Sequence, residues 1–289
     1  MRRVGLSLNH NYLNYDFFKQ MASSGVTDVE ISVEYDFQES LDPKKILADA
    51  KNAGVRIWSF HLPFCPFDLI NPAFFDETKR ENTVKFLSSI IKKWGENGIK
   101  RFVIHASGEP NADNERPLLL SQAKKSLEEL SVVAKEYDAI IAVEDLPRTC
   151  LGNHHSDILY LIGDNPNLGV CFDTNHLLSE RGEDFLRAVK GRLVTVHISD
   201  FDYINERHWL PGEGKIDWVS MMDALDEVGY DGTFLYELSF LSTKSIFRPT
   251  PLTPAHFYQN ARELHERKPL TVNYAPYPNI DFWGNRIEK

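Results

Sequence analysis

The feature that most constrains this chain is the regular alternation of short apolar runs with longer stretches of helical periodicity. Most of the runs are apolar on both faces near their centres, which is typical of parallel strands covered by helices. The eight runs span residues 4–9, 27–33, 55–62, 101–106, 139–146, 168–175, 193–199 and 233–239. Eight strand–helix units within about 250 residues are the number that a (β/α)8 barrel requires.

Helical spacing of apolar residues separates the runs and is clearest over 76–95, 118–137 and 216–228. A doubly wound sheet is the alternative fold, but it normally has a glycine-rich turn after its first strand, and SLNHNY contains no glycine. We therefore predict an α/β fold with a single (β/α)8 TIM barrel over residues 1–268 as the catalytic domain. The aromatic and proline-rich segment 269–289 is predicted to be an extended tail that packs on the barrel or on the partner subunit of a homo-oligomer.

The charge of the chain narrows the classes of partner. There are 32 Lys+Arg and 42 Asp+Glu, a net charge of −10, which argues against a broad nucleic-acid or anionic-membrane surface. Three cysteines form neither a disulfide framework nor a CxxC motif. No apolar run approaches the ~20 residues of a membrane span, and polar residues interrupt any signal core near the start. We expect a soluble cytoplasmic protein without a membrane partner.

Ionisable residues recur near the C-terminal ends of the predicted strands, where barrel active sites are built. They are Glu30, His61, His105, Glu144, Asp173, His197 and Glu237. Several carboxylates packed together repel one another, and a bound divalent cation removes that repulsion. The alternative interpretation is that they are buried hydrogen-bonding residues, but their equivalent places on successive strands favour a metal site.

The predicted metal core comprises one residue from each of strands five to eight: Glu144, Asp173, His197 and Glu237. Three carboxylates and one imidazole form a mostly hard, oxygen-rich donor set. Such a set suits one Mn²⁺ ion, with Mg²⁺, Co²⁺ or Zn²⁺ as alternatives. Four protein ligands would leave positions for two substrate oxygens.

Two loops add further polar and aromatic candidates. The motif DTNH follows strand six, and ERHW follows strand seven ahead of a PGEG turn. These motifs supply His176, Glu206, Arg207, His208 and Trp209. Trp209, Phe64 and Phe67 offer flat apolar walls for a ligand. No phosphate-binding motif is evident, which favours an unphosphorylated ligand.

The ordered set FHLPF, VIHAS, VEDLP, FDTNH, VHISD, PGEG and YELS resembles the xylose isomerase-like TIM barrel superfamily. The resemblance is to the branch that contains sugar and sugar-phosphate isomerases and epimerases and is related to endonuclease IV. It covers roughly residues 4–261. No single piece is diagnostic, whereas their order along the chain is specific.

The resemblance implies particular roles for these residues. In epimerase-like members, residues matching Glu144, Asp173, His197 and Glu237 hold one metal ion, often Mn²⁺, and the two glutamates act as the acid/base pair. The positions of His176 and of a nearby arginine, here Arg207, contact substrate oxygens. Residues His61, His105, His208 and Trp209 join them as candidate substrate contacts. The implied activity is metal-dependent isomerisation or epimerisation of a keto sugar or polyol derivative through an enediolate.

Two alternatives remain on the same scaffold. Endonuclease IV, a zinc-dependent AP endonuclease, uses a larger three-zinc set, for which His61, His105, His176, Glu206 and His208 would be the additional ligands. That family has aspartate where this chain has Glu206, and its basic DNA-contacting loops have no obvious counterpart here. A dehydratase or lyase could also use the same metal site. The small-carbohydrate interpretation is favoured over a nucleic-acid substrate.

Overall fold

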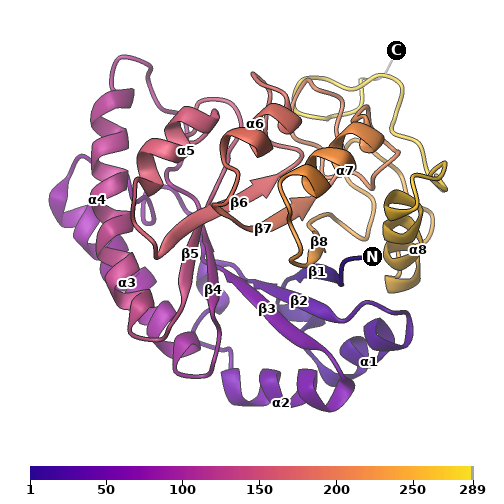
Figure 1. Cartoon of the computed structure of the whole chain (residues 1–289), viewed down its shortest axis with the longest axis horizontal. Coiled ribbons are helices and arrows are strands. Elements are labelled where there is room, and N and C mark those ends of the chain that lie inside the picture. The colour runs from indigo at the N-terminus through magenta and orange to yellow at the C-terminus, as the bar shows by residue number, and fades with distance from the viewer. Residues whose placement is uncertain (288–289) are drawn as a thin grey trace.

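The computed structural model describes residues 1–287, in which eight parallel strands close into a barrel in chain order (Figure 1). The strands are β1 (Val4–Leu8), β2 (Asp28–Ser32), β3 (Arg56–His61), β4 (Arg101–Ile104), β5 (Ile140–Glu144), β6 (Leu168–Asp173), β7 (Leu193–Ile198) and β8 (Phe234–Tyr236). The helices are α1 (Tyr15–Ser23), α2 (Pro43–Ala53), α3 (Glu77–Gly95), α4 (Arg116–Lys135), α5 (His155–Ile162), α6 (Gly182–Ala188), α7 (Trp218–Glu227) and α8 (Pro254–His265). The predicted (β/α)8 barrel is confirmed.

Each predicted apolar run contains one strand, and the three predicted helices correspond to α3, α4 and α7. The runs continue past the paired residues, most of all at β8, where Glu237 follows the last strand residue. The residues that follow β5, β6 and β7 in these runs are buried, whereas Glu237 and Leu238 after β8 are half-buried and Ser239 is exposed. Apolar periodicity therefore marks burial rather than strand pairing after β5, β6 and β7.

Local chemistry explains where individual helices begin and end. The Asp42 side chain accepts hydrogen bonds from backbone N–H groups of the first turn of α2, and Pro43 occupies that turn. Gly54 ends α2 with φ of +80°, a conformation that strongly favours glycine. Asp217 caps α7 in the same way after the PGEG turn, as expected for a helix that starts near that residue.

A buried carboxylate lies at the N-terminal end of the barrel strands and is paired with two arginines. Asp28 is completely buried, and it accepts hydrogen bonds from Arg3 Nε at 3.0 Å and Arg56 Nε at 2.9 Å. Thr233 Oγ1 donates a third, 2.7 Å long. The charge at this end is therefore paired locally, and the ionisable groups that remain for chemistry lie at the opposite end of the strands.

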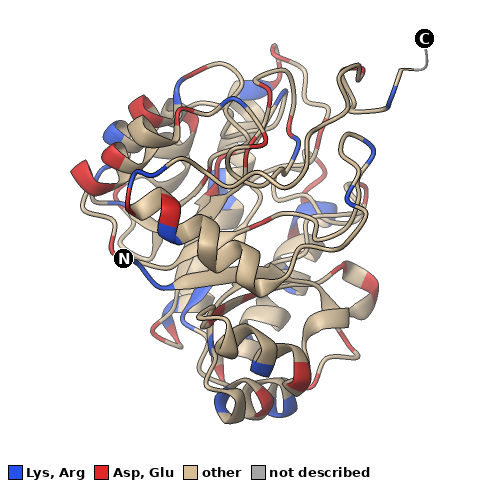
Figure 2. Cartoon of the chain, turned by 90° about the vertical axis from the view of Figure 1, so that its right-hand side faces the viewer, with Lys and Arg blue, Asp and Glu red and all other residues tan. Residues whose placement is uncertain are grey.

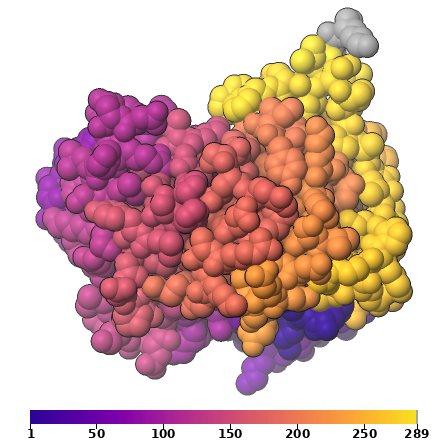
Figure 3. Space-filling view, turned by 45° about the horizontal axis from the view of Figure 1, so that its top comes forward, coloured from indigo at the N-terminus to yellow at the C-terminus, as the bar shows by residue number. Residues whose placement is uncertain are grey.

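After α8, residues 266–287 run as an extended segment along the C-terminal third of the barrel (Figure 3). Arg207 Nη1 and Asn205 Nδ2, both on the loop after β7, donate to the carbonyl of Phe282 at 2.9 and 3.2 Å. The segment is thus tied to a loop of the barrel rim. Residues 288–289 of the predicted tail lie outside the described residues. Within residues 1–287, no helix has both the length and the apolar character that crossing a bilayer requires.

Candidate active site

Three carboxylates meet one imidazole nitrogen at the C-terminal end of the barrel. His197 Nδ1 lies 2.8 Å from Glu144 Oε1, 3.2 Å from Glu237 Oε2 and 3.9 Å from Asp173 Oδ2. Strand pairing produces this arrangement, because Asp173 lies opposite His197 across β6 and β7. Glu144 ends β5, and Glu237 follows β8. The structure therefore brings the four predicted metal ligands together in one group, which we call the carboxylate cluster.

One buried oxygen of the carboxylate cluster lacks a hydrogen-bond donor among the described residues. Glu144, Asp173 and His197 are completely buried, and Asp173 Oδ2 has no hydrogen-bond partner among the described residues. Burial, and then the charge of Glu237, raises the pKa of Asp173 well above its usual range. A buried carboxylate oxygen without a donor is costly unless it coordinates a cation. The donor set therefore fits a divalent metal ion.

Two histidines hold the other oxygen of Glu144. His61 Nε2 lies 3.0 Å and His105 Nε2 3.1 Å from Glu144 Oε2. Burial lowers the pKa of His61, but the hydrogen bond and charge of Glu144 outweigh burial and raise it to about 9. Burial acts in the opposite direction on a carboxyl group and by itself would raise the pKa of Glu144. His197, His105 and His61 nevertheless hold that pKa well below its usual range. Glu144 is thus ionised.

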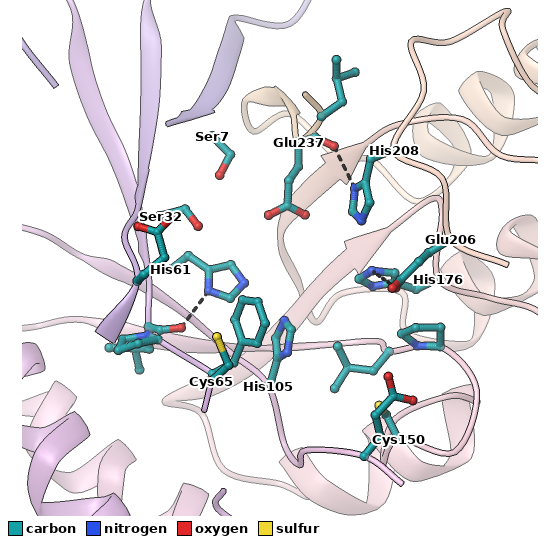
Figure 4. Close-up of a pocket in the computed structure, with 18 of the residues that line it drawn as sticks. Ser7, Ser32, His61, Cys65, His105, Cys150, His176, Glu206, His208 and Glu237 are labelled. Carbon is teal, nitrogen blue, oxygen red and sulfur yellow. Dashed lines mark hydrogen bonds and ion pairs between the residues drawn. The ribbon is translucent and has the colours of Figure 1, made fainter. Parts of the chain in front are cut away.

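A second group lies on the loops after β6 and β7. His176 Nδ1 donates to the Asp145 carbonyl at 2.8 Å, which leaves Nε2 facing Glu206 Oε2 at 3.6 Å. His208 Nδ1 donates to the Glu237 carbonyl at 3.1 Å (Figure 4). One ligand atom from each of His176, Glu206 and His208 lies within 4.8 Å of the others, and the same is true of His61, His105 and Glu144. Each trio therefore groups three potential metal ligands.

A cavity of about 590 Å³ opens over these residues. Figure 4 shows Glu237, His61 and His105 directed toward the same space, with His176 and His208 beside it. Phe64 and Phe67 line the cavity, and the Phe64 ring stacks on His105 with ring centroids 4.1 Å apart. A concave site with apolar walls and a few convergent polar groups suits a small polyhydroxylated ligand.

Both arginines that line the cavity are paired with carboxylates. Arg148 Nε lies 2.9 Å from Glu109 Oε2, and Arg148 Nη1 lies 3.1 Å from Glu206 Oε1. Arg207 Nε donates to Asp202 at 2.8 Å, and its Nη1 and Nη2 donate to tail carbonyls. No lysine among residues 1–287 lines the cavity. The expected substrate contact of Arg207 would therefore compete with bonds that its guanidinium already makes.

Trp209 lies elsewhere than the sequence suggested. It is buried and outside the cavity lining, and its indole N–H donates to Ser245 Oγ at 2.9 Å. The backbone of Trp209 forms an antiparallel bridge with Asp200. The geometry does not provide the substrate contact expected of Trp209.

Sequence analysis also missed residues that line the cavity. Arg148 and Glu109 were not singled out, because both lie beyond the strand ends in loops whose paths periodicity does not predict. Asp145, which lies outside the cavity lining, was also missed: it directly follows Glu144 in VEDLP, and its Oδ1 accepts the backbone N–H of Asp173 at 2.7 Å. Its position one residue after the strand end was the signal that could have identified it.

Comparison with known protein families finds a family that has the same barrel fold. The family model described as xylose isomerase-like TIM barrel matches residues 18–248. The chain belongs to this family. The resemblance noted in the sequence motifs is thereby confirmed at the level of the family.

Individual relatives are similar to this chain over part of its length. The probable endonuclease 4 of Mycoplasmoides gallisepticum is 28% identical over 184 residues, which is 56% of this chain and 58% of that protein. The inosose isomerase of Bacillus velezensis is 29% identical over 171 residues, or 53% and 58%. The chain spans about three fifths of the length of these curated relatives. The crystal structure of a D-tagatose 3-epimerase-like protein superposes with a TM-score of 0.76 at 22% identity, covering 92% of this chain and 98% of that one.

Proposed function

We propose that this protein is a divalent-metal-dependent isomerase or epimerase of an unphosphorylated keto sugar or polyol derivative. The observation that carries the proposal is the convergence of Glu144, Asp173 and Glu237 on His197 Nδ1 beneath an open cavity. Membership of the xylose isomerase-like family and the similarity to an inosose isomerase support the same reaction class.

The residues of the carboxylate cluster would hold one ion. Its mainly oxygen donors suit Mn²⁺, with Mg²⁺, Co²⁺ or Zn²⁺ as alternatives. When bound, the ion supplies Lewis acidity that stabilises negative charge on the carbonyl and adjacent hydroxyl oxygens of the substrate. The unpartnered Oδ2 of Asp173 is the atom whose surroundings most need such a cation.

Glu144 and Glu237 are the proposed acid/base pair. The pKa of Glu237 lies below its usual range, because the positive charge of His197 outweighs burial. Glu144 is also ionised, so each carboxylate can accept a proton from the carbon next to the substrate carbonyl. Protonation of the resulting enediolate on its other face gives an epimer, and protonation of the neighbouring carbon gives an isomer. Glu237 borders the cavity, whereas Glu144 lies beneath it, held by His61 and His105.

The charges of the cavity support a neutral substrate. A phosphate group needs a free guanidinium, ammonium or cluster of N–H donors. Arg148 and Arg207 are the cavity's cationic side chains apart from histidines, and each already pairs with carboxylates. The hydroxyl groups of a sugar require no net positive charge, and Phe64 and Phe67 offer apolar surface for its C–H faces.

Solvent-deuterium incorporation tests this proposal directly. A panel of keto sugars is incubated in deuterium oxide with the Mn²⁺-loaded protein, with chelator-treated protein as the control. We expect deuterium at the carbon next to the carbonyl in at least one sugar. Incorporation that is equally fast in protein verified to be metal-free would contradict the proposal.

Two variants separate the roles of the glutamates. Glu144→Gln and Glu237→Gln keep the side-chain shape but cannot accept a proton at neutral pH. Each should lose turnover by about 10²–10⁴-fold. The variant that lacks only the returning group should still exchange the substrate proton without forming the new isomer. Metal content is measured for both variants, because a loss of the ion would otherwise imitate a loss of the base.

A second candidate, an endonuclease IV-like AP endonuclease, is favoured by one specific observation. Two trios of potential ligands lie at the cavity: His61, His105 and Glu144, and separately His176, Glu206 and His208. The charge pattern opposes it, since the net charge is −10 and Figure 2 shows Lys and Arg interspersed with Asp and Glu over the helices. Binding of three zinc ions together with incision of a duplex at an abasic site would establish the endonuclease. Under the sugar proposal, we expect no incision.

A further inference from the structure

Glu30 lies on β2, and its carboxylate is completely buried. It belongs neither to the proposed acid/base pair nor to the proposed metal ligands. Its Oε1 accepts a hydrogen bond from Ser7 Oγ at 3.0 Å, and its Oε2 accepts one from Ser59 Oγ at 2.7 Å. The same Oε1 lies 3.0 Å from Nε2 of His197. The His197 ring therefore lies between Glu30 on one side and the carboxylate cluster on the other.

Strand register fixes Glu30 at this level of the barrel interior. Glu30 is paired with Ser7 across β1 and β2, and with Ser59 across β2 and β3. The β2–β3 pairing shifts between Val29 and Glu30, and an irregularity of this kind re-aims a side chain. The two flanking hydroxyl groups come from neighbouring strands, so the carboxylate is held from both sides.

The chemistry of an imidazole ligand explains why a carboxylate belongs here. An imidazole that binds a metal through one nitrogen carries its proton on the other, and that N–H needs an acceptor. His197 Nδ1 faces the carboxylate cluster, so Nε2 would carry the proton. Nε2 has no well-aligned hydrogen bond among the described residues, and its contact with Glu30 is short but bent.

Burying Glu30 for packing alone would be unfavourable. A carboxyl group that loses water in the interior needs hydrogen bonds or charged partners to compensate its desolvation. Arg3 and Arg56 compensate Asp28, two residues earlier on β2, whereas among the described residues Glu30 contacts two hydroxyls and the His197 imidazole at 2.7–3.0 Å. His197 is the partner that can carry positive charge within 3.0 Å of it.

We propose that Glu30 is a positioning residue, which holds the His197 ring with Nε2–H toward itself and Nδ1 toward the bound metal ion. The part of this inference that concerns the ion rests on the proposed function. The part that concerns the ring does not, because the contact belongs to the protein alone. Replacing an outer partner of a ligating histidine typically weakens metal binding by about 10–100-fold, and we expect a loss in that range.

Glu30→Gln is the test variant, because the amide keeps the shape while the charged acceptor is lost. Asp28→Asn is the matched control, since Asp28 is also completely buried on β2 but contacts Arg3 and Arg56 instead. Three measurements are made on each protein: the free energy of unfolding, the Zn²⁺ affinity, and the Nε2–H resonance of His197. The last comes from ¹H–¹⁵N spectra of histidine-labelled protein without metal. Zn²⁺ serves as a diamagnetic probe ion.

In Glu30→Gln we expect the Nε2–H proton of His197 to move upfield, because a neutral amide replaces the carboxylate that lies 3.0 Å from Nε2. We also expect Zn²⁺ affinity to fall about 10–100-fold. Asp28→Asn should change neither, although it loses stability. An unchanged Nε2–H resonance in Glu30→Gln, or an equal loss of Zn²⁺ affinity in Asp28→Asn, would overturn the proposal. If the wild-type protein binds no divalent ion, the proposed function fails, and the metal-free spectra still decide whether Glu30 holds the ring.

Discussion

Asp173→Asn should make the metal-free protein more stable and at the same time remove its response to metal. The Asp173 Oδ1 atom accepts the backbone N–H of Asn175 at 2.7 Å, and the asparagine oxygen can keep that bond. The Oδ2 atom has no donor within the described residues and lies among Glu144 and Glu237. An amide at this place is uncharged and offers N–H groups to those carboxylates.

The magnitude follows from the unpartnered oxygen. A buried polar group without a hydrogen bond costs about 1–3 kcal/mol, so the free energy of unfolding without metal should rise by about that amount. Wild-type protein should gain about 2.7 kcal/mol when Mn²⁺ is present at about 100 times its Kd, and the variant should gain almost nothing. The variant is therefore the more stable protein without metal and loses this advantage when metal is added.

The advantage of the variant should also depend on pH. The pKa of Asp173 in the folded protein is raised above its value of 3.8, chiefly by burial and then by Glu237. Below pH 3.8 the carboxyl is protonated in both the folded and unfolded states, so its charge imposes no penalty there. Between 3.8 and the folded-state pKa the carboxyl is ionised in the unfolded state but protonated in the folded state, so the penalty grows over that range and is constant above it. The difference between asparagine and aspartate should accordingly be smallest below pH 3.8 and larger at neutral pH.

Urea denaturation with and without Mn²⁺ measures both effects. Asp145→Asn is the matched control, because Asp145 is another buried aspartate with one bonded and one unpartnered oxygen and is not a predicted ligand. That control should gain stability without metal yet keep the Mn²⁺ response. Full Mn²⁺ stabilisation in Asp173→Asn, or a loss of its metal-free stability, would refute the assignment of Asp173 as a ligand.

Three further predictions concern groups around the site. The His61 pKa of about 9, against 6.5 when unfolded, corresponds to about 3 kcal/mol of stability in the metal-free protein. This stability is complete below pH 6.5 and is lost as the pH rises to about 9, so His61→Gln should flatten the measured stability–pH curve over that window. Glu213→Gln breaks a buried ion pair with Arg248, in which Nη1 and Nη2 of Arg248 each lie 2.7 Å from a carboxylate oxygen of Glu213. The variant should lower the unfolding free energy by about 3–5 kcal/mol in urea titrations, whereas a loss below about 1 kcal/mol would show the pair to be dispensable. Arg207→Met removes the bonds to Asp202 and to the tail carbonyls, so limited proteolysis should cleave the C-terminal segment faster, and an unchanged cleavage rate would show that other contacts hold the tail.

The sequence alone determined the barrel and the membership of the carboxylate cluster. Alternation of apolar runs and helical periodicity has few solutions, and closing eight parallel strands places all their C-terminal ends on one rim. Glu144, Asp173 and Glu237 each stand at or next to such an end, and His197 lies one residue before the end of β7. Their convergence therefore follows from chain position once the topology is known. The exact strand ends were not predicted, because buried residues continue past several strands, such as Thr174 and Asn175 after β6.

The tertiary structure decided which partner each polar side chain takes. Arg207 and Trp209 stand beside His208 in the same loop, yet one binds Asp202 and the tail and the other packs against Ser245. Glu30 was visible as a strand-end carboxylate, but its contact with His197 joins β2 to β7 across the barrel interior. Periodicity reports which residues are buried, because burial repeats with the geometry of one element. Pairings between distant elements depend on loop paths and barrel register, which no local pattern encodes.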